Sequence, residues 1–244
     1  MPKPIMVTLD SVRLDLNKPT FHFRDWLDHV IQIFNSKSVI LVFACYSWIF
    51  PQYKMMFRGL LVEDVRVFGT AGSVSADNAL DEYRMLKYLT VVTQEVTDRT
   101  LQAPLIRLRM DHVGLRSETD ISKFKCLNLD LEYDDIDPNG GEIINNFVRQ
   151  MVQSSDSKME SVYFVARRRF LPENFIPEVM DGIEYEEALK EQVRRFYRDF
   201  ERPYFRGWPE FKGGIDFERK DGVKMTLIYK ELGIHVHFVI MLWH

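Results

Sequence analysis

The feature that most constrains this chain of 244 residues is a short apolar pattern that recurs along its first two thirds. Each copy has an apolar residue, two variable residues, an apolar residue, one variable residue and a third apolar residue. Successive copies begin 19 to 35 residues apart, and most of these intervals are near the roughly 20 to 29 residues of a leucine-rich repeat. The seven copies are Leu9-Val12-Leu14, Val39-Val42-Ala44, Val62-Val65-Val67, Leu86-Leu89-Val91, Leu105-Leu108-Met110, Phe124-Leu127-Leu129 and Met159-Val162-Phe164.

Each copy predicts a short strand followed by a segment that returns along the other side of the chain. Stacked units of this kind form parallel strands, and each repeat contacts mainly its neighbours. Apolar residues at helical spacing predict return helices at 23–34, after the N-cap Thr20, and at 143–152, after a Gly-rich turn. Shorter return segments are expected at 76–85 and 118–124.

The expected fold class is α/β: an irregular leucine-rich-repeat-like solenoid with a parallel sheet. The pattern is loose, and the Asn that follows the strand of a regular repeat is mostly absent, so an unrelated α/β fold is the alternative. In the solenoid we expect four large side chains to be buried. They are Trp26 and Phe34 on the first return helix, and Leu108 and Leu127 at the centres of two copies.

The repeats stop after Val165, and the remainder of the chain predicts a small C-terminal helix plus an antiparallel strand cap. Glutamates near its start and arginines near its end favour an amphipathic helix at 182–200. The inward residues of that helix would be Tyr185, Leu189, Val193, Phe196 and Phe200. Strands are expected at 215–219, 225–230 and 235–243, with a hairpin turn at 220–222. We therefore expect residues 1–165 to form the repeat region and residues 166–244 to cover its open end.

Charge and cysteine content exclude several classes of protein. Lys and Arg number 32 and Asp and Glu number 36, so the formal net charge is −4, which is opposite to that of a general nucleic-acid binder. Cys45 and Cys126 are the only cysteines, so a disulfide framework is excluded and a reducing compartment is expected. No apolar run is long enough to span a bilayer. We expect a soluble protein of the cytoplasm or nucleus with no membrane partner.

Several short motifs follow one another in an order that is itself informative. They are Trp26-Leu27 with Ile33-Phe34-Asn35, Asn146-Phe147-Val148, Met159-Glu160-Ser161-Val162, the Lys220-Asp221-Gly222 turn, and an aromatic strand that ends at Trp243. In this order they resemble the nematode F-box-associated domain of the second type, over roughly residues 20 to 244. The resemblance implies a protein-recognition module without enzymatic activity or cofactor. Its implied role is to bind the protein substrate of an SCF-type ubiquitin ligase.

Members of that family normally carry an F-box ahead of this domain, and the F-box binds the Skp adaptor of the ligase. Here the first predicted strand is already reached at Leu9, which leaves no room for an F-box in front of the repeats. We therefore expect either a fragment or a shortened relative. A Skp-type adaptor is an expected partner only where an F-box lies upstream.

Other constellations of reactive residues give weaker hypotheses. His235 and His237 alternate on one strand, but no third metal ligand is evident. An acidic run from Asp130 to Asp137 lacks the ligand order of a calcium loop, and no catalytic motif is present, so we expect no metal and no catalytic residue. Aromatic and basic residues mix at 204–208, as in single-strand binders. The alternatives to protein recognition are an enzyme with a site not recognisable from sequence, or an RNA-binding module.

The candidate binding surface follows from strand alternation, because the side chains between the buried ones point to the opposite, open face of the sheet. Arg109 could clamp a carboxylate of a partner in bidentate fashion. The alternative is that Arg107 and Arg109 pair internally with Asp111 and Asp130. The predicted protein-binding residues are Arg66, Tyr88, Arg107, Arg109, Asp111, Asn128, Asp130 and Tyr163, with Asp64, Thr90 and Ser161 on the same face.

Overall fold

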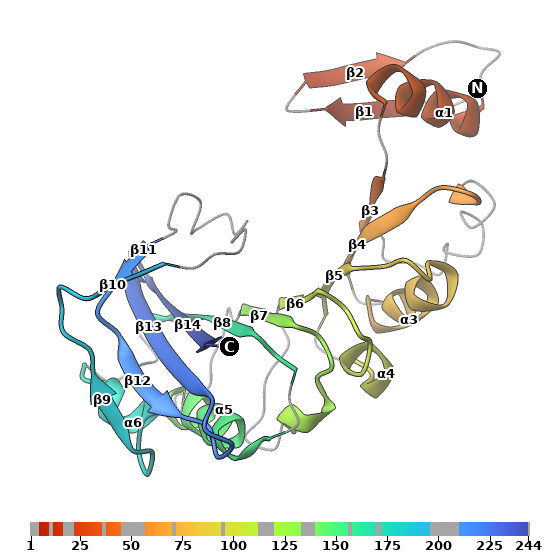
Figure 1. The fold of residues 1–244 in the computed structure, drawn as a ribbon. Helices are drawn as coiled ribbons and strands as arrows, with labels where there is room; N and C mark the ends of the chain where they lie inside the picture. The colour runs from red at the N-terminus through yellow and green to blue at the C-terminus, as the bar shows by residue number, and fades with distance from the viewer. Residues whose placement is uncertain are drawn as a thin grey trace.

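The computed structural model describes residues 5–9, 12–16, 22–35, 38–44, 57–69, 72–93, 96–111, 120–132, 140–155, 158–168, 171, 173–195 and 210–243. The protein is α/β, and its largest element is a mixed sheet of ten strands in the order β3-β4-β5-β6-β7-β8-β14-β13-β12-β9. In Figure 1 this sheet curves through the molecule, with helices along its convex side.

Six strands of the sheet run parallel, in the order in which they occur along the chain. This order confirms the prediction made from the repeated pattern for the copies that begin at 62, 86, 105, 124 and 159. The strands are β3 (Val39–Ala44), β4 (Val62–Phe68), β5 (Tyr88–Val92), β6 (Arg107–Asp111), β7 (Asn128–Glu132) and β8 (Ser161–Arg167).

One row of apolar residues on the helix-facing side shows how the repeats align. Val65, Leu89, Leu108, Leu129 and Val162 are successive register partners, and each is at most 1% exposed. Burial of this row supplies much of the driving force for stacking the strands, since each such side chain contributes about 1.5–3 kcal/mol.

The predicted register is wrong for two copies of the pattern. Leu129, not Leu127, aligns with Leu108, so the sixth copy is Cys126-Leu129-Leu131 and Leu127 is only half-buried. The turn before β7 contains a short 3-10 helix at Ile121–Lys123, which lies within the return segment expected at 118–124.

In the second copy, Val42 faces away from the helices and is 58% exposed, whereas Leu41 is buried. The sequence of β3 is apolar at every position from Val39 to Ala44, so alternation could not show which face is inward.

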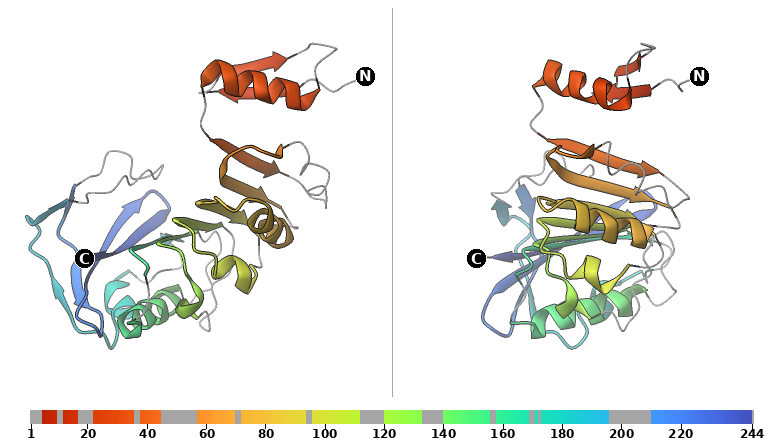
Figure 2. Two further views of the ribbon diagram at one scale, coloured as in Figure 1. Left: turned by 45° about the vertical axis from the view of Figure 1, so that its right-hand side comes forward. Right: turned by 90° about the vertical axis from the view of Figure 1, so that its right-hand side faces the viewer.

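The return segments lie on one side of the sheet, as Figure 2 shows. They are α3 (Gly72–Glu82), α4 (Asp98–Leu101) and α5 (Gly140–Gln153). The prediction for α5 is confirmed, because Ile144, Phe147, Val148 and Met151 are buried. The ring centroids of Phe147 and Phe164 lie 4.8 Å apart in an edge-to-face arrangement, which joins this helix to β8.

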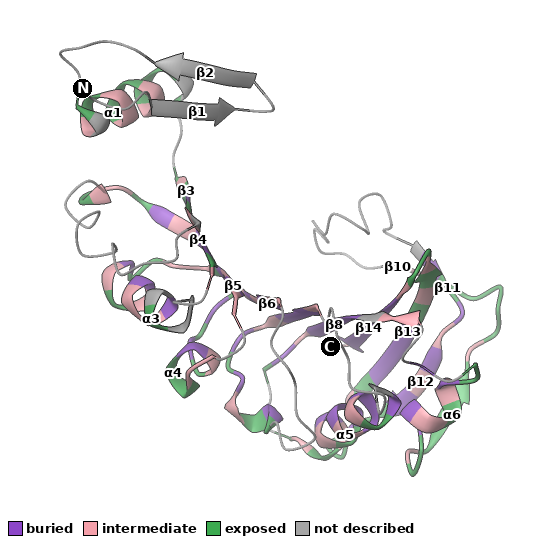
Figure 3. Cartoon of the chain, turned by 180° about the vertical axis from the view of Figure 1, so that it is seen from behind, coloured by how far each residue is buried: buried purple, intermediate pink, exposed green. Residues whose placement is uncertain are grey.

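The C-terminal strands continue the same sheet. β14 (His235–Trp243) pairs antiparallel with β8, and the sheet continues through β13 (Lys224–Leu232), β12 (Ile215–Glu218) and β9 (Tyr185–Glu187). The predicted hairpin is confirmed, and Gly222 has the positive φ of 86° that its turn requires. The sheet thus crosses the expected boundary at residues 165 and 166 without interruption, and Figure 3 shows dense burial in β8, β13 and β14.

The amphipathic helix predicted at 182–200 is wrong for the residues that the structure describes. Two short strands occur there instead, β9 and β10 (Val193–Arg195), and the expected inward residues Tyr185, Leu189 and Val193 are 39%, 79% and 46% exposed. β9 hydrogen-bonds to β12 and β10 to β11 (Glu210–Lys212). Strand pairing with distant residues has overridden a helical propensity, which is only a weak preference. Phe196 and Phe200 lie outside the described residues.

The N-terminal segment forms a hairpin of β1 (Ile5–Leu9) and β2 (Val12–Leu16), followed by α1 (Phe23–Phe34). The helix confirms the predicted first return helix. The first copy of the pattern is wrong, because Leu9 and Val12 are partners on opposite strands of the hairpin. Trp26 is half-buried rather than buried, and the side chain of Phe34 lies outside the described residues.

The short α6 (Ile176–Val179) contacts α5 and packs Val179 into the main core. Among the described residues, no helix is long and apolar enough to cross a membrane.

Candidate functional site

The candidate site is the open face of the sheet, which we define as the side opposite α3, α4 and α5. Strand register aligns its side chains in rows that cross five parallel strands. One row is Asp64, Tyr88, Arg107, Asn128 and Ser161, and the next is Arg66, Thr90, Arg109, Asp130 and Tyr163. The structure therefore brings together all the residues predicted for this face, with Asp111 in a third row beside Glu132.

Arg109 is the centre of an ion-pair network on this face. Its Nε donates to Asp111 at 2.9 Å, and its Nη2 donates to Glu132 at 2.5 Å. Burial alone would lower the pKa of the guanidinium, but the hydrogen bond to Asp111 and the surrounding carboxylates hold it above its ordinary value. The side chain stays 31% exposed, so Arg109 is a fixed cation that still faces solvent.

The other two arginines of the face are also beside carboxylates. Arg66 pairs with Asp64 at 2.9 Å, and Arg107 lies 3.9 Å from the carboxylate of Asp130. Internal pairing, which was the alternative to partner binding, is thus present for both Arg107 and Arg109. It does not remove them from the surface, because the side chains of Arg66 and Arg107 are 45% and 25% exposed.

Towards β8 the open face becomes buried. Ser161 donates to Asn128 at 2.6 Å and is 3% exposed, and Tyr163 is 5% exposed. Phe211 of β11 belongs to a second small core on this side, together with Tyr163, Val165, Ile228, Val239 and Met241. Tyr163 therefore lies in the predicted row but contributes to packing, and the accessible polar surface runs from β4 to β7.

Sequence reasoning predicted Tyr88 but missed the other residues at the apolar end of the face, which are Ile40, Val42 and Phe68. Ile40 and Val42 of β3 are 56% and 58% exposed, and Phe68 and Tyr88 on the next two strands are 37% and 36% exposed. Register places Ile40 beside Asp64 and Val42 beside Arg66. The signal that could have found Ile40 and Val42 is the continuous apolar run of β3, which puts large side chains on both faces.

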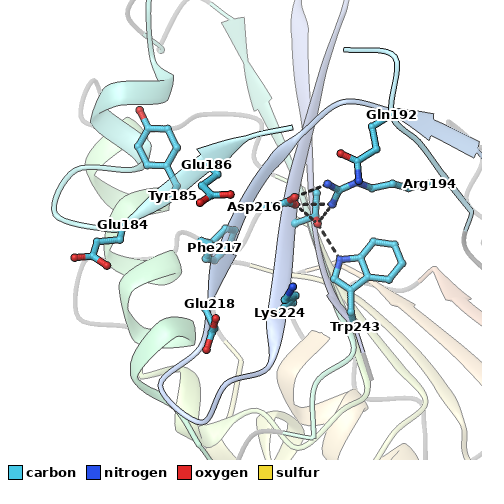
Figure 4. A pocket seen from close by; sticks show the side chains of 11 residues that line it. Glu184, Tyr185, Glu186, Gln192, Arg194, Asp216, Phe217, Glu218, Lys224 and Trp243 are labelled. Atoms are coloured by element: carbon cyan, nitrogen blue, oxygen red, sulfur yellow. Dashed lines mark hydrogen bonds and ion pairs between the residues drawn. The ribbon is translucent and has the colours of Figure 1, made fainter. Parts of the chain in front are cut away.

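A second hollow on the same side of the sheet lies at its other end, over β12 and β13 (Figure 4). This pocket has a volume of about 680 Å³. The side chains of Asp216 and Thr226 are cross-strand partners at its floor, and Trp243 follows on β14. Sequence reasoning missed the pocket because it placed the flanking residues 184–194 on a helix.

The floor of the pocket is a closed hydrogen-bond network. Arg194 donates to both Asp216 and Thr226, Thr226 donates to Asp216 at 2.6 Å, and the Trp243 indole donates to Thr226 at 2.8 Å. Burial alone would raise the pKa of Asp216, but the hydrogen bonds from Arg194 and Thr226 hold it below its ordinary value. Arg194 also lies over the Trp243 ring, with its guanidinium carbon 5.9 Å from the ring centre.

The remaining constellations carry little reactive chemistry in the described residues. His235 and His237 have ring centroids 6.3 Å apart, but no group of three metal-binding side chains is found in the part of the chain that the structure describes. Burial raises the pKa of the Cys126 thiol to about 12, which keeps it protonated and unreactive. Cys45, the acidic residues 134–137 and the aromatic and basic segment 204–208 lie outside the described residues.

No protein family, curated protein or solved structure matches this chain.

Proposed function

We propose that the open face of the sheet binds a protein partner, and that the chain is the substrate-binding part of an F-box protein of an SCF-type ubiquitin ligase. The observation that carries the first part is the group of three partly exposed arginines, Arg66 on β4 with Arg107 and Arg109 on β6, held on one face by strand register and bordered by exposed apolar side chains. Arginine and aromatic residues are enriched among the residues that dominate binding energy at protein interfaces.

The surface has the chemistry of an interface. Hydrogen bonds to carboxylates hold the guanidinium groups of Arg66 and Arg109 in one orientation, so binding a partner costs less entropy for ordering these long side chains. The apolar end at Ile40 and Val42 would supply desolvated contact area beside the charged centre. We also propose that the parallel half of the sheet is an irregular leucine-rich-repeat-like solenoid, in which the inner face of the curved sheet is the binding surface.

The assignment to a ubiquitin ligase is supported by the order of sequence motifs, from Trp26-Leu27 to the aromatic strand that ends at Trp243. It predicts more than binding. A partner that is a ligase substrate should have a longer half-life in cells that lack this protein, whereas a partner of a simple scaffold should not.

Site-specific photocrosslinking tests the binding face directly. A photoreactive amino acid is placed at Thr90, which lies between Arg66 and Arg109 in the register, and in a matched variant at Arg99 of α4 on the helix side. We expect a crosslinked protein from position 90 that is absent from position 99. Equal crosslinking from both positions, or none from position 90, would contradict the proposed face.

A further inference from the structure

The pocket over β12 and β13 differs in charge from the arginine-rich centre of the open face. Arg194 is used internally, because both of its terminal nitrogens donate to Asp216 or Thr226 and its side chain is only 10% exposed. The Arg194–Asp216 pair is neutral as a unit. The charge that the pocket presents to solvent is therefore set by the other side chains that line it.

Three of these other side chains are glutamates and one is a lysine: Glu184, Glu186, Glu218 and Lys224. All four residues are exposed, and none of the three glutamates forms an ion pair with another residue that the structure describes. Three negative charges against one positive charge leave the lining with an excess of two negative charges. Such a lining attracts a cation.

The positions of two of these glutamates are fixed by the sheet. Glu186 is the cross-strand partner of Asp216, and Glu218 lies two residues further along β12, so both project from the same side of the sheet. Figure 4 shows both glutamates on one side of Asp216, with the Trp243 indole on the other side and Lys224 between Glu218 and Trp243. The hydrogen bond to Thr226 fixes the indole in this orientation.

The geometry points to a site for a basic side chain, arginine or lysine, of the protein bound to the open face. Such a side chain has an apolar stem and a charged end. Its stem would lie along Trp243, and its cationic end would lie between Glu186 and Glu218. The volume of about 680 Å³ leaves room for this group together with part of the neighbouring peptide. The source of the ligand rests on the proposed function, because the pocket lies on the same side of the sheet.

The floor makes the pocket selective for a cation. Asp216 and Arg194 satisfy each other's charge, and the Thr226 hydroxyl already has one acceptor and two donors, which is its full capacity. The floor therefore has few unused hydrogen-bond donors or acceptors for a neutral polar ligand. The exposed carboxylates of Glu186 and Glu218 remain as acceptors.

The test uses the purified chain and small probes, so it does not depend on identifying the partner. Binding is followed by the NMR signal of the Trp243 indole N–H, assigned with Trp243→Phe. The probes are the capped tripeptide acetyl-Gly-Arg-Gly-amide, the same peptide with neutral citrulline in place of arginine, and free agmatine. We expect the arginine peptide to shift the signal and the citrulline peptide to leave it unchanged.

Charge removal provides the matched comparison. The double variant Glu186→Gln with Glu218→Gln should bind the arginine peptide with a Kd at least about fivefold higher. This loss corresponds to two exposed ion pairs. The control pair Glu142→Gln with Glu173→Gln changes exposed glutamates elsewhere and should have no effect. Equal binding of the citrulline peptide, or unchanged binding in the first double variant, would overturn the site. Tighter binding of agmatine than of the arginine peptide would overturn the assignment to a protein side chain.

This outcome is separable from that of the proposed function. Arginine binding at the pocket without crosslinking from position 90 would support the pocket and contradict the proposed protein-binding face. Crosslinking from position 90 without arginine binding would do the reverse.

Discussion

The Tyr163 hydroxyl lies 2.6 Å from Nδ1 of His237, and both side chains are at most 5% exposed. This pair joins β8 to β14, at the point where the parallel half of the sheet meets the antiparallel half. A buried hydrogen bond at this junction makes the protonation state of one imidazole relevant to the stability of the whole sheet.

Acid should therefore destabilise the protein through His237. Burial lowers the pKa of His237 below its ordinary value of 6.5, and the charges of His235 and Lys230 act in the same direction. Because the unfolded chain binds the proton more readily than the folded chain, stability is present above pH 6.5 and is lost as the pH falls below it. Urea unfolding at a series of pH values between 7.5 and 5 measures this change in free energy.

The control for this prediction is His237→Gln, whose side chain does not titrate. It should be less stable than the natural protein at pH 7.5, because the buried pair is altered, but its free energy of unfolding should fall less between pH 7 and 5.5. An equally steep fall in the variant would assign the pH dependence to other groups.

The alignment of Leu108 and Leu129 predicts unequal effects for two similar substitutions. Leu108 is 0% exposed in the centre of the main core, so Leu108→Ala should cost about 2–5 kcal/mol of unfolding free energy. Leu127 lies one residue before β7 and is only half-buried, so Leu127→Ala should cost clearly less. Thermal or chemical unfolding of the two variants checks the register, and a larger effect at Leu127 would contradict it.

This comparison also shows what the sequence could establish. The order and direction of the strands from Val62 to Phe164 could be predicted, because each repeat buries the same two or three apolar positions against its neighbours. The inward face is predictable where polar and apolar residues alternate, as in β6. The predicted register is wrong at Leu127, because the same pattern also fits two residues later at Cys126-Leu129-Leu131. It is wrong in β3 because every position there is apolar and either face could be inward.

The polar rows of the open face could be predicted for the same reason, since they are the complement of the buried rows. The pocket could not. Its side chains come mainly from β9, β10, β12, β13 and β14, and they meet only because β9 pairs with β12 rather than continuing as a helix. The paired residues of β9 and β12 are about 30 positions apart in the sequence. The apolar residues around β9 have helical spacing, so the local sequence gives no sign of this strand pairing.

The network under the pocket predicts a specific role for the Thr226 hydroxyl. Thr226 is 0% exposed and links Asp216, Arg194 and Trp243. Thr226→Val keeps the shape of the side chain but leaves three polar partners with one fewer hydrogen bond, which should cost about 1–3 kcal/mol. Thr226→Ser, which keeps the hydroxyl, should retain most of the stability. Unfolding curves that rank the two variants in the opposite order would contradict this role.

Cys126 should be unreactive in the folded protein. Burial raises the pKa of its thiol to about 12, and the thiolate is the reactive form. At pH 8 we expect alkylation of the peptide that contains Cys126, measured by mass spectrometry, to be far slower in the folded chain than in urea. Rapid alkylation under native conditions would show that the segment before β7 opens readily.

The arginines of the open face give the decisive test of the binding surface. Arg107→Ala with Arg109→Ala should weaken capture of the crosslinked partner by about 2 kcal/mol or more. The same change leaves Asp111, Asp130 and Glu132 without their cations, so some loss of stability is also expected.

The variant with lysine at positions 107 and 109 separates the two effects. It keeps the charges, and therefore most of the stability, but it lacks the planar two-pronged contact that guanidinium makes with a carboxylate. We expect the free energy of unfolding of the lysine variant to be close to that of the natural protein. Its affinity for the partner should nevertheless be clearly lower. The control is Arg99→Ala with Lys123→Ala, which removes two exposed ion pairs, with Asp81 and Asp98, on the helix side. Partner capture that is equal in the control and in both arginine variants would move the binding site away from the open face.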